Sequence, residues 1–374
     1  MQFYDFKEIE ERVILIGVQT EQDEDVAASL DELEELAATA GAVTVGKVIQ
    51  NREAVHPGTY IGKGKIEEVA ALLAAYDANG VICDDELSPA QMNNLERELD
   101  CKVMDRTLLI LDIFAGRATT SEGKIQVELA QLRYRSARLV GLRESLSRLG
   151  GGIGTRGPGE KKLETDRRLI RTRISALKAE LAQVEKHREL IRGKRTRGNL
   201  KTAAIVGYTN AGKSTLLNTL TGAGILAEDK LFATLDPTTR VLELKDGQQI
   251  LLTDTVGFIR KLPHHLVEAF KSTLEEAKYA DYIIHVVDAS NPQAELQMHT
   301  VYETLRELGA TGKKIITLLN KQDQVQGEAL RDFRADYTVK CSARTGEGLE
   351  ELKDVLAKLL AESQIYLEDL QRGW

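Results

Sequence analysis

The chain has 374 residues, 42% of them hydrophobic, and its 50 Lys and Arg residues against 58 Asp and Glu residues give a net charge of −8. This length favours two or three domains, and the apolar content excludes a wholly disordered chain. The sequence contains no apolar run of the roughly 18 residues that a membrane-spanning helix needs. The acidic N-terminus lacks the apolar core of a signal peptide. We therefore expect a cytoplasmic protein without stable membrane insertion.

Residues 1–118 alternate between strand-like and helix-like stretches. The apolar run RVILIGV at 12–18 predicts a strand, and leucines at helical spacing within 25–39 predict a helix. Ser88 and Pro89 are typical of the cap and first turn of a further helix that runs to Leu99. The other expected elements are strands at 42–49, 80–85 and 101–105 and a helix at 65–76. Such alternation predicts a small parallel α/β domain.

Residues 119–199 are expected to form an antiparallel helical hairpin. Apolar residues recur three, four or seven positions apart on both sides of the glycine-rich stretch GGGIGTRGPGE at 150–160. The two sets are Ile125, Leu129, Leu132, Leu139, Leu142, Leu146 and Leu149, and Leu163, Ile170, Ile174, Leu177, Leu181, Val184 and Ile191. The spacing predicts two helices that fold back on one another.

The hairpin is strongly basic within an acidic protein. Residues 124–199 contain 20 Lys and Arg residues against 8 Asp and Glu residues. A local basic segment of this kind favours contact with a polyanion. The tip carries Arg156, Lys161 and Lys162, which suit the phosphates of an RNA cleft. A solvated charged helix and a plain connecting loop remain open alternatives.

Residues 200–363 form the third expected domain, followed by a short C-terminal tail at 364–374. Its first stretch, KTAAIVGYTNAGKSTLLNTL at 201–220, is a strand, a loop and a helix that fit the pattern G-x-x-x-x-G-K-[ST]. In such a loop the backbone N–H groups and the helix N-terminus bind phosphate oxygens. Lys213 can neutralise the β- and γ-phosphates, and the Ser214 hydroxyl is a ligand for Mg²⁺.

Two later stretches indicate which base is bound. ITLLNKQD at 316–323 is an apolar strand that ends in Asn320, Lys321 and Asp323. The Asp323 carboxylate can accept hydrogen bonds from N1–H and the exocyclic amine of guanine, a pair of donors that adenine lacks. Lys321 can lie along the base, and Asn320 can tie this loop to the phosphate loop. CSARTGEGL at 341–349 adds the Ser342–Ala343 backbone, so the set predicts a GTPase.

The loops between these motifs are expected to sense the γ-phosphate. LFATLDPTTR at 231–240 offers Thr234 for Mg²⁺ and the γ-phosphate, with Thr238 and Thr239 as alternatives. In TDTVGFIR at 253–260, Asp254 would hold the metal through water, and the Gly257 N–H would meet the γ-phosphate. Because both contacts are lost on hydrolysis, the two loops would act as a switch. We expect Lys213, Thr234 and Gly257 to be catalytic, with Ser214 and Thr234 as metal ligands.

Phe258 follows this motif at a position that often holds a water-orienting Gln. A phenyl ring cannot orient water, so hydrolysis is expected to be slow or to be helped by another group, a cation or a partner. Asn210 in the phosphate loop is one candidate, because its amide could help to hold a potassium ion near the β/γ bridge.

The GTPase motifs, the Phe after D-T-V-G, HPGTYIGKGK at 56–65 and GGGIGTRGPGEKKLETDRR at 150–168 together resemble the HflX family over essentially the whole chain. The resemblance implies an α/β fold: a P-loop GTPase domain preceded by a small parallel α/β domain and a helical hairpin. The family's nucleotide-binding roles carry over to Gly207, Tyr208, Thr209, Asn210, Ala211, Gly212, Lys213, Ser214, Thr215, Phe232, Ala233, Thr234, Leu235, Asp236, Asp254, Thr255, Val256, Gly257, Asn320, Lys321, Asp323, Ser342 and Ala343.

The resemblance also implies a partner. It predicts a protein, expected here to be a monomer, that binds the rRNA of the large ribosomal subunit through the basic hairpin and the N-terminal domain and splits stalled or idle ribosomes. Two other interpretations remain open. One is a GTPase of tRNA modification or membrane-surface signalling whose hairpin is a dimerisation arm. The other is a non-enzymatic RNA-binding clamp.

Overall fold

The computed structural model describes residues 10–21, 25–149, 158–197, 200–222, 224, 231–245, 247–261, 271–325 and 330–372. The chain divides into two compact units. The N-terminal unit comprises Met1–Gly116 and Lys124–Leu181, and the C-terminal unit comprises Arg117–Gly123 and Ala182–Trp374. One boundary falls at the end of the helix Arg106–Arg117, and the other two fall inside the two long helices of the middle region. Each unit is described by itself.

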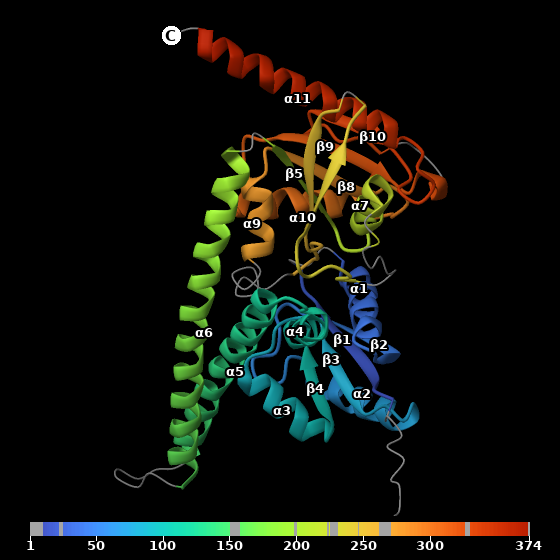
Figure 1. The fold of residues 1–374 in the computed structure, drawn as a ribbon. Helices are drawn as coiled ribbons and strands as arrows, with labels where there is room; N and C mark the ends of the chain where they lie inside the picture. Colours follow the sequence, from blue (N-terminus) through green and yellow to red (C-terminus); the bar gives the residue numbers. More distant parts are fainter. Residues whose placement is uncertain are drawn as a thin grey trace, which may run out of the picture. The chain divides into compact units, whose positions relative to one another are not determined.

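The N-terminal unit contains a four-stranded sheet in the order β2-β1-β3-β4, and every pairing in it is parallel (Figure 1). Its strands are β1 (Arg12–Gln19), β2 (Val43–Asn51), β3 (Gly80–Cys83) and β4 (Lys102–Asp105). The helices between and after them are α1 (Val26–Thr39), α2 (Lys63–Ala75), α3 (Pro89–Leu99) and α4 (Arg106–Arg117). The prediction of a small parallel α/β domain is confirmed.

Local signals set where these helices begin. The Ser88 hydroxyl accepts a hydrogen bond from the N–H of Gln91, whose side chain accepts one from the N–H of Ser88, so α3 opens with the expected cap. α2 begins at Lys63, two residues earlier than expected, because Gly62 rather than a later residue is its N-cap. Apolar residues at every second position of β1 then pack with α2 and α3; they are Ile14, Ile16 and Val18.

The hairpin consists of α5 (Ser121–Leu149) and α6 (Pro158–Arg197). In the N-terminal unit the two helices share a cluster formed by the predicted seam residues Ile125, Leu129, Leu132, Ile174, Leu177 and Leu181. The glycine-rich tip lies mostly outside the described residues. The predictions made for the Arg156, Lys161 and Lys162 side chains, for seam positions from Leu142 to Leu163 and for Ile191 also fall outside them.

The C-terminal unit contains a six-stranded sheet in the order β10-β9-β8-β5-β7-β6. The pairings are parallel except for the edge strand β6, which runs antiparallel to β7. The strands are β5 (Lys201–Gly207), β6 (Thr238–Glu243), β7 (Gln249–Asp254), β8 (Tyr282–Asp288), β9 (Lys314–Asn320) and β10 (Tyr337–Lys340). The helices are α7 (Lys213–Thr221), α9 (Lys271–Tyr279), α10 (Ala294–Glu307), the 3-10 turn η1 (Gln322–Gln324) and α11 (Leu349–Arg372).

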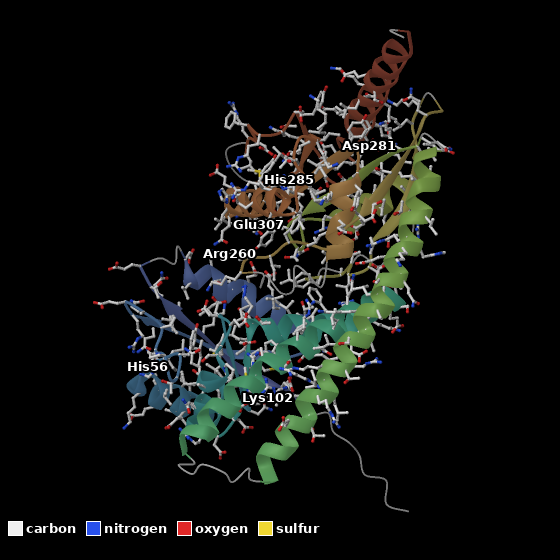
Figure 2. The ribbon with its side chains drawn as sticks, turned by 90° about the vertical axis from the view of Figure 1, so that its left-hand side faces the viewer. His56, Lys102, Arg260, Asp281, His285 and Glu307 are labelled. Carbon is white, nitrogen blue, oxygen red and sulfur yellow. The ribbon has the colours of Figure 1, made fainter. Side chains whose placement is uncertain are left out.

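Helices cover both faces of this sheet (Figure 1). Leucines of α7 and α11 pack with β5, β7, β8 and β9 in the main core, whereas α10 contributes Ala294 and Met298 to a second cluster with Val287 and Leu319. His285 lies on β8 within this layered core and is 1% exposed (Figure 2). α11 runs to Arg372, so most of the expected C-terminal tail continues this helix.

The parallel pairing of the strands brings the sequence motifs to one edge of the sheet. β5, β7, β8 and β9 all direct their carboxyl ends to the same edge, where Gly207, Asp254, Asp288 and Asn320 stand. In open α/β sheets this edge is where ligands bind. Within the part of the chain that the structure describes, no helix is both long and apolar enough to cross a membrane.

Candidate active site

The phosphate loop joins the end of β5 to the start of α7. Gly212 has a φ of +94°, a conformation that side chains rarely adopt, and a Cβ there would lie 2.4 Å from Nδ2 of Asn320. α7 then begins at Lys213, directly after Gly212, so the backbone N–H groups of its first turn lie at the loop. The predicted strand, loop and helix are therefore present, and the loop needs glycine at this close approach.

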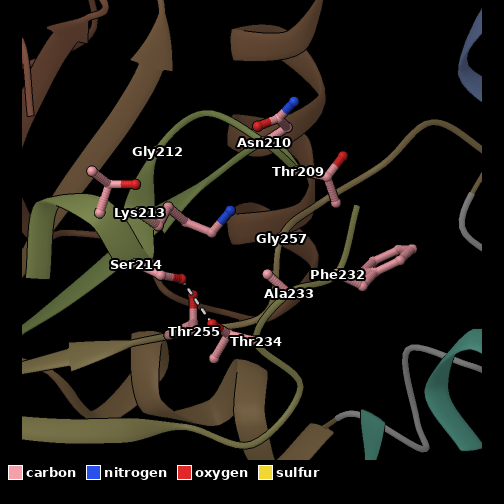
Figure 3. Close-up of a pocket in the computed structure, with 11 residues that line it drawn as sticks. Thr209, Asn210, Gly212, Lys213, Ser214, Phe232, Ala233, Thr234, Thr255 and Gly257 are labelled. Atoms are coloured by element: carbon pink, nitrogen blue, oxygen red, sulfur yellow. Dashed lines mark hydrogen bonds between the residues drawn. The ribbon is translucent and has the colours of Figure 1, made fainter. Parts of the chain in front are cut away.

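A cavity opens over this loop (Figure 3). Its lining combines the phosphate loop, the loop that precedes β6 and the turn after β7. The lining residues are Thr209, Asn210, Gly212, Lys213, Ser214, Thr215, Phe232, Ala233, Thr234, Thr255 and Gly257. Stretches that are far apart in the sequence thus form one concave, largely polar surface at the helix N-terminus, where anions are stabilised.

Three oxygen atoms meet at the floor of the cavity. Ser214 Oγ lies 2.8 Å from Thr234 Oγ1 and donates a hydrogen bond of 2.7 Å to Oδ2 of Asp254. Thr234 Oγ1 donates to the same Oδ2 at 3.0 Å. Asp254 is fully buried, and its Oδ1 has no hydrogen-bond partner among the described residues. Burial raises the pKa of Asp254, although Lys213 and the two hydroxyls oppose the shift.

This donor set fits Mg²⁺. Two hydroxyls and one buried carboxylate offer only oxygen, which the ion prefers, and a few protein ligands leave room for water and substrate phosphates. The uncompensated Asp254 Oδ1 also points to a missing positive charge or donor, because buried polar atoms normally have partners. Thr234, the predicted residue, occupies this position, whereas Thr238 and Thr239 begin β6.

Lys213 lies at the centre of the site. Its side chain is 7% exposed, and Nζ donates a hydrogen bond of 2.7 Å to the carbonyl oxygen of Tyr208. Burial lowers the pKa of Lys213 to about 8, partly opposed by Asp254. A buried ammonium held this way can neutralise phosphate charge.

The predicted base-recognition residues form a second group beside the loop. Asn320, at the end of β9, donates from Nδ2 to the carbonyl oxygen of Ala211 at 2.8 Å, and its Oδ1 accepts from the N–H of Ala343 at 2.8 Å. One side chain therefore connects the phosphate loop to the Ser342–Ala343 turn. Asp323 is exposed, and a hydrogen bond from the Ser342 side chain is the main cause that lowers its pKa.

Lys321 adopts a left-handed conformation with φ of 61°, and its Nζ lies 2.7 Å from Oδ2 of Asp288. Asp288 was not among the residues predicted for the site. Its only signal was its place as the last residue of the apolar strand YIIHVVD. This strand, β8, pairs in parallel with β9, so that Asp288 lies opposite Asn320.

Phe258 does not line the cavity. It is 1% exposed, and its backbone pairs with the phosphate loop: its N–H donates to Gly207 O at 3.1 Å, and its carbonyl accepts from the N–H of Thr209 at 2.8 Å. The ring thus packs in the interior while the backbone ties the two loops together. Tyr208, Ala211, Val256 and Leu235 are likewise buried beside the cavity, and the Asp236 carboxylate bonds to Thr119 and Thr120.

Known proteins resemble the chain along nearly its whole length. Three family descriptions match: GTP-binding GTPase N-terminal over residues 27–115, GTP-binding GTPase Middle Region over 117–195, and 50S ribosome-binding GTPase over 202–321. A relative named GTPase HflX from Lacrimispora saccharolytica is 70% identical over 365 residues, which is 97% of this chain and 86% of the relative.

Two further relatives carry the same name. The protein from Caldanaerobacter subterraneus subsp. tengcongensis is 52% identical over 94% of this chain and 81% of its own, and that from Escherichia coli K12 is 45% identical over 94% and 83%. The crystal structure of a complex of SsGBP and GDP is similar with a TM-score of 0.52 at 28% identity, covering 94% of this chain and 99% of that chain.

Proposed function

The chain belongs to the HflX family of GTPases, and from this premise we propose that it binds the large ribosomal subunit and uses GTP to split or recycle stalled or idle ribosomes. The observation that carries the proposal is the match of residues 202–321 to a family described as 50S ribosome-binding GTPases. The basic charge of residues 124–199 supports an RNA surface as the partner, because phosphates supply much of the affinity in such contacts.

In this proposal the phosphate loop holds the triphosphate. Backbone N–H groups of Thr209–Thr215 and the N-terminus of α7 surround the phosphates, and the Lys213 ammonium moves from the Tyr208 carbonyl to the β- and γ-oxygens. Ser214 and Thr234 would hold Mg²⁺ directly, and Asp254 would hold it through water. When bound, the metal neutralises charge that develops on the phosphate oxygens.

Guanine is recognised at the edge of the sheet. Asp323 accepts from N1–H and the exocyclic amine, Lys321 lies along the ring, and the backbone of Ser342–Ala343 contacts the guanine carbonyl. Asn320 holds these segments against the phosphate loop through Ala211. Replacing Asp323 with Asn should therefore exchange guanine preference for xanthine, whose 2-oxo group needs a donor.

Hydrolysis proceeds without a side chain at position 258 that can orient water. We propose that Asn210, which lines the cavity with a φ of 59°, helps to hold a potassium ion beside the β/γ bridge. Equal hydrolysis rates in potassium and sodium buffers would contradict this role. The Gly257 N–H and Thr234 close over the γ-phosphate and release it after hydrolysis.

Co-sedimentation tests the partner. The chain, acting as a cytoplasmic monomer, should pellet with large ribosomal subunits in the presence of a non-hydrolysable GTP analogue and much less with GDP or with small subunits. Reversing the charges of Arg156, Lys161 and Lys162 should weaken this binding and leave GTP affinity unchanged. If the chain does not bind large subunits in any nucleotide state, the proposal fails, and a GTPase with another target would replace it.

A further inference from the structure

The short segment that leads into α5 contacts the loop that carries Thr234 and Asp236. This root segment, residues 117–123, and the threonine loop, residues 231–237, belong to the same compact unit. Oδ2 of Asp236 accepts hydrogen bonds from the backbone N–H groups of Thr119 at 2.9 Å and Thr120 at 2.8 Å, and from the Thr119 hydroxyl at 2.7 Å. Oδ1 accepts from the Thr120 hydroxyl at 2.5 Å. One carboxylate therefore receives four hydrogen bonds from two consecutive residues.

The start of α5 is shaped for this carboxylate. The Thr120 hydroxyl oxygen accepts a hydrogen bond from the N–H of Gly123 at 3.0 Å and so caps the helix. A Cβ on Gly123 would lie 2.4 Å from Oδ1 of Asp236, so any larger residue would displace the carboxylate. Negative charge is favourable at a helix N-terminus. Burial tends to raise the pKa of Asp236, but the hydrogen bonds from Thr120 and Thr119 outweigh it and keep the pKa low.

A second contact fixes the same segment. Arg188 on α6 lies 3.1 Å from Glu122 in the first turn of α5 and 3.4 Å from Glu275 on α9. All three side chains are mostly shielded from solvent. The root segment is thus held from two sides within the C-terminal unit, so it can serve as a fixed support rather than a free linker.

Asp236 stands two residues after Thr234, the residue whose hydroxyl reaches Ser214 and Asp254. We propose that Thr119 and Thr120 are positioning residues for GTP hydrolysis, because by holding Asp236 they hold the threonine loop in the conformation that places Thr234 at the metal site. This inference rests on the proposed role of Thr234. It also makes the nucleotide state and the start of α5 mutually dependent, since coupling between two sites is reciprocal.

Two variants test the support without removing Thr234. Asp236→Asn keeps the shape of the side chain but replaces one acceptor oxygen with an N–H₂ donor that faces other donors. Thr119→Val removes one hydroxyl and leaves the Thr120 cap intact. Each should speed release of a non-hydrolysable GTP analogue about tenfold, the effect of one lost charge-assisted hydrogen bond, and should slow hydrolysis at saturating GTP. GDP release should stay unchanged, because the contacts proposed for Thr234 with Mg²⁺ and the γ-phosphate are lost on hydrolysis.

A matched control lies at the opposite end of the same sheet. Asp281, labelled in Figure 2, accepts from the N–H of Thr202 at 2.9 Å and from its hydroxyl at 3.1 Å. Thr202→Val removes the same kind of bond at the amino end of β5, away from the cavity, and should leave the release of both nucleotides unchanged.

Combining Thr119→Val with Thr234→Ala distinguishes a failure of this inference from a failure of the proposed function. If Thr234→Ala alone leaves release of the GTP analogue and hydrolysis unchanged, the proposed site is wrong. If it has an effect, Thr119→Val should add nothing further in that background. Equal acceleration of GDP and GTP-analogue release by Thr119→Val, or an undiminished effect in the Thr234→Ala background, would overturn the inference.

Discussion

Lys321 Nζ lies 2.7 Å from Oδ2 of Asp288, and this ion pair joins the ends of two neighbouring parallel strands. Oδ1 of Asp288 accepts from the N–H and hydroxyl of Ser290 at 3.0 and 2.6 Å, which fixes the carboxylate. The pair is partly shielded, with side chains 23% and 13% exposed. The ion pair therefore fixes the position of the Lys321 ammonium group. This in turn holds the aliphatic part of the side chain, which we propose lies along guanine.

Asp288→Asn should therefore weaken nucleotide binding. We expect the dissociation rates of GDP and GTP to rise about fivefold to tenfold, because the Lys321 ammonium loses its fixed partner. Stopped-flow release of a fluorescent nucleotide measures this. Asp336→Asn is the matched control, since Asp336 pairs with Lys314 at 2.7 Å at the opposite end of β9. Similar nucleotide dissociation rates for the two variants would contradict the role proposed for the Asp288–Lys321 ion pair.

Asn320→Ala should destabilise the C-terminal unit and impair nucleotide binding together. Asn320 is 3% exposed, and its removal leaves the Ala211 carbonyl and the Ala343 N–H without their partner. Two buried unpaired groups correspond to a loss of about 2–4 kcal/mol in the free energy of unfolding. Chemical denaturation and GDP titration measure the two effects.

Asn79→Ala provides the comparison for that variant. Asn79 also bridges two backbone groups, accepting from the N–H of Arg12 and donating to the carbonyl of Glu10, each at 3.0 Å, but it is exposed. Solvent can replace both bonds there, so its loss should change stability by less than about 1 kcal/mol. An equal loss for both variants would show that burial is not the cause.

The lowered pKa of Lys213 predicts a pH dependence of GTP binding. Its pKa is about 8 because of burial, so the ammonium is largely intact at pH 7 and is lost as the pH rises above 8. Bound phosphate favours the charged form, and GTP affinity should fall above pH 8 by at most about tenfold per unit. Lys213→Arg should remove this fall, because guanidinium stays charged. If GTP affinity falls with the same slope in both proteins, the cause is deprotonation of the nucleotide and not of Lys213.

His285 predicts a loss of stability in acid. Burial lowers its pKa to about 4 from 6.5. Because the folded state binds the proton more weakly than the unfolded state, the stability of the C-terminal unit should decline as the pH falls from 6.5 towards 4 and change little above that range. The full effect is about 3 kcal/mol.

His285→Phe removes the titrating group and retains an aromatic ring beside Tyr302, which packs edge-on at 5.2 Å. Unfolding measured between pH 4.5 and 7.5 should therefore show a shallower acid decline for this variant. Identical pH profiles for the two proteins would show that another group causes the decline.

Local sequence patterns predicted many of the helices and strands. The apolar run at 12–18 predicted β1, which ends one residue later. Apolar residues three, four or seven positions apart predicted the pair of helices in which Ile125, Leu129 and Leu177 meet. These predictions succeed because period and capping are local properties of the chain. The division into three domains and a short C-terminal tail and the roles of the individual site residues stay predictions.

Contacts between distant segments could not be predicted in this way. Asp288 meets Lys321 only because β8 and β9 pair in parallel, and Asp236 meets Thr120 across 116 positions of the sequence. Neither pair has a local signature. Phe258 illustrates the same limit: the sequence marked an absent Gln, whereas the structure buries the ring and uses the backbone to join two loops.

The decisive experiment for a ribosome-dependent GTPase is GTP hydrolysis by the purified chain, measured alone and with added large ribosomal subunits in potassium buffer. We expect large subunits to raise the hydrolysis rate about tenfold or more and small subunits to leave it unchanged, because a partner completes a site that lacks a water-orienting residue. An unchanged rate with large subunits, in a preparation that binds GTP tightly, would contradict this expectation.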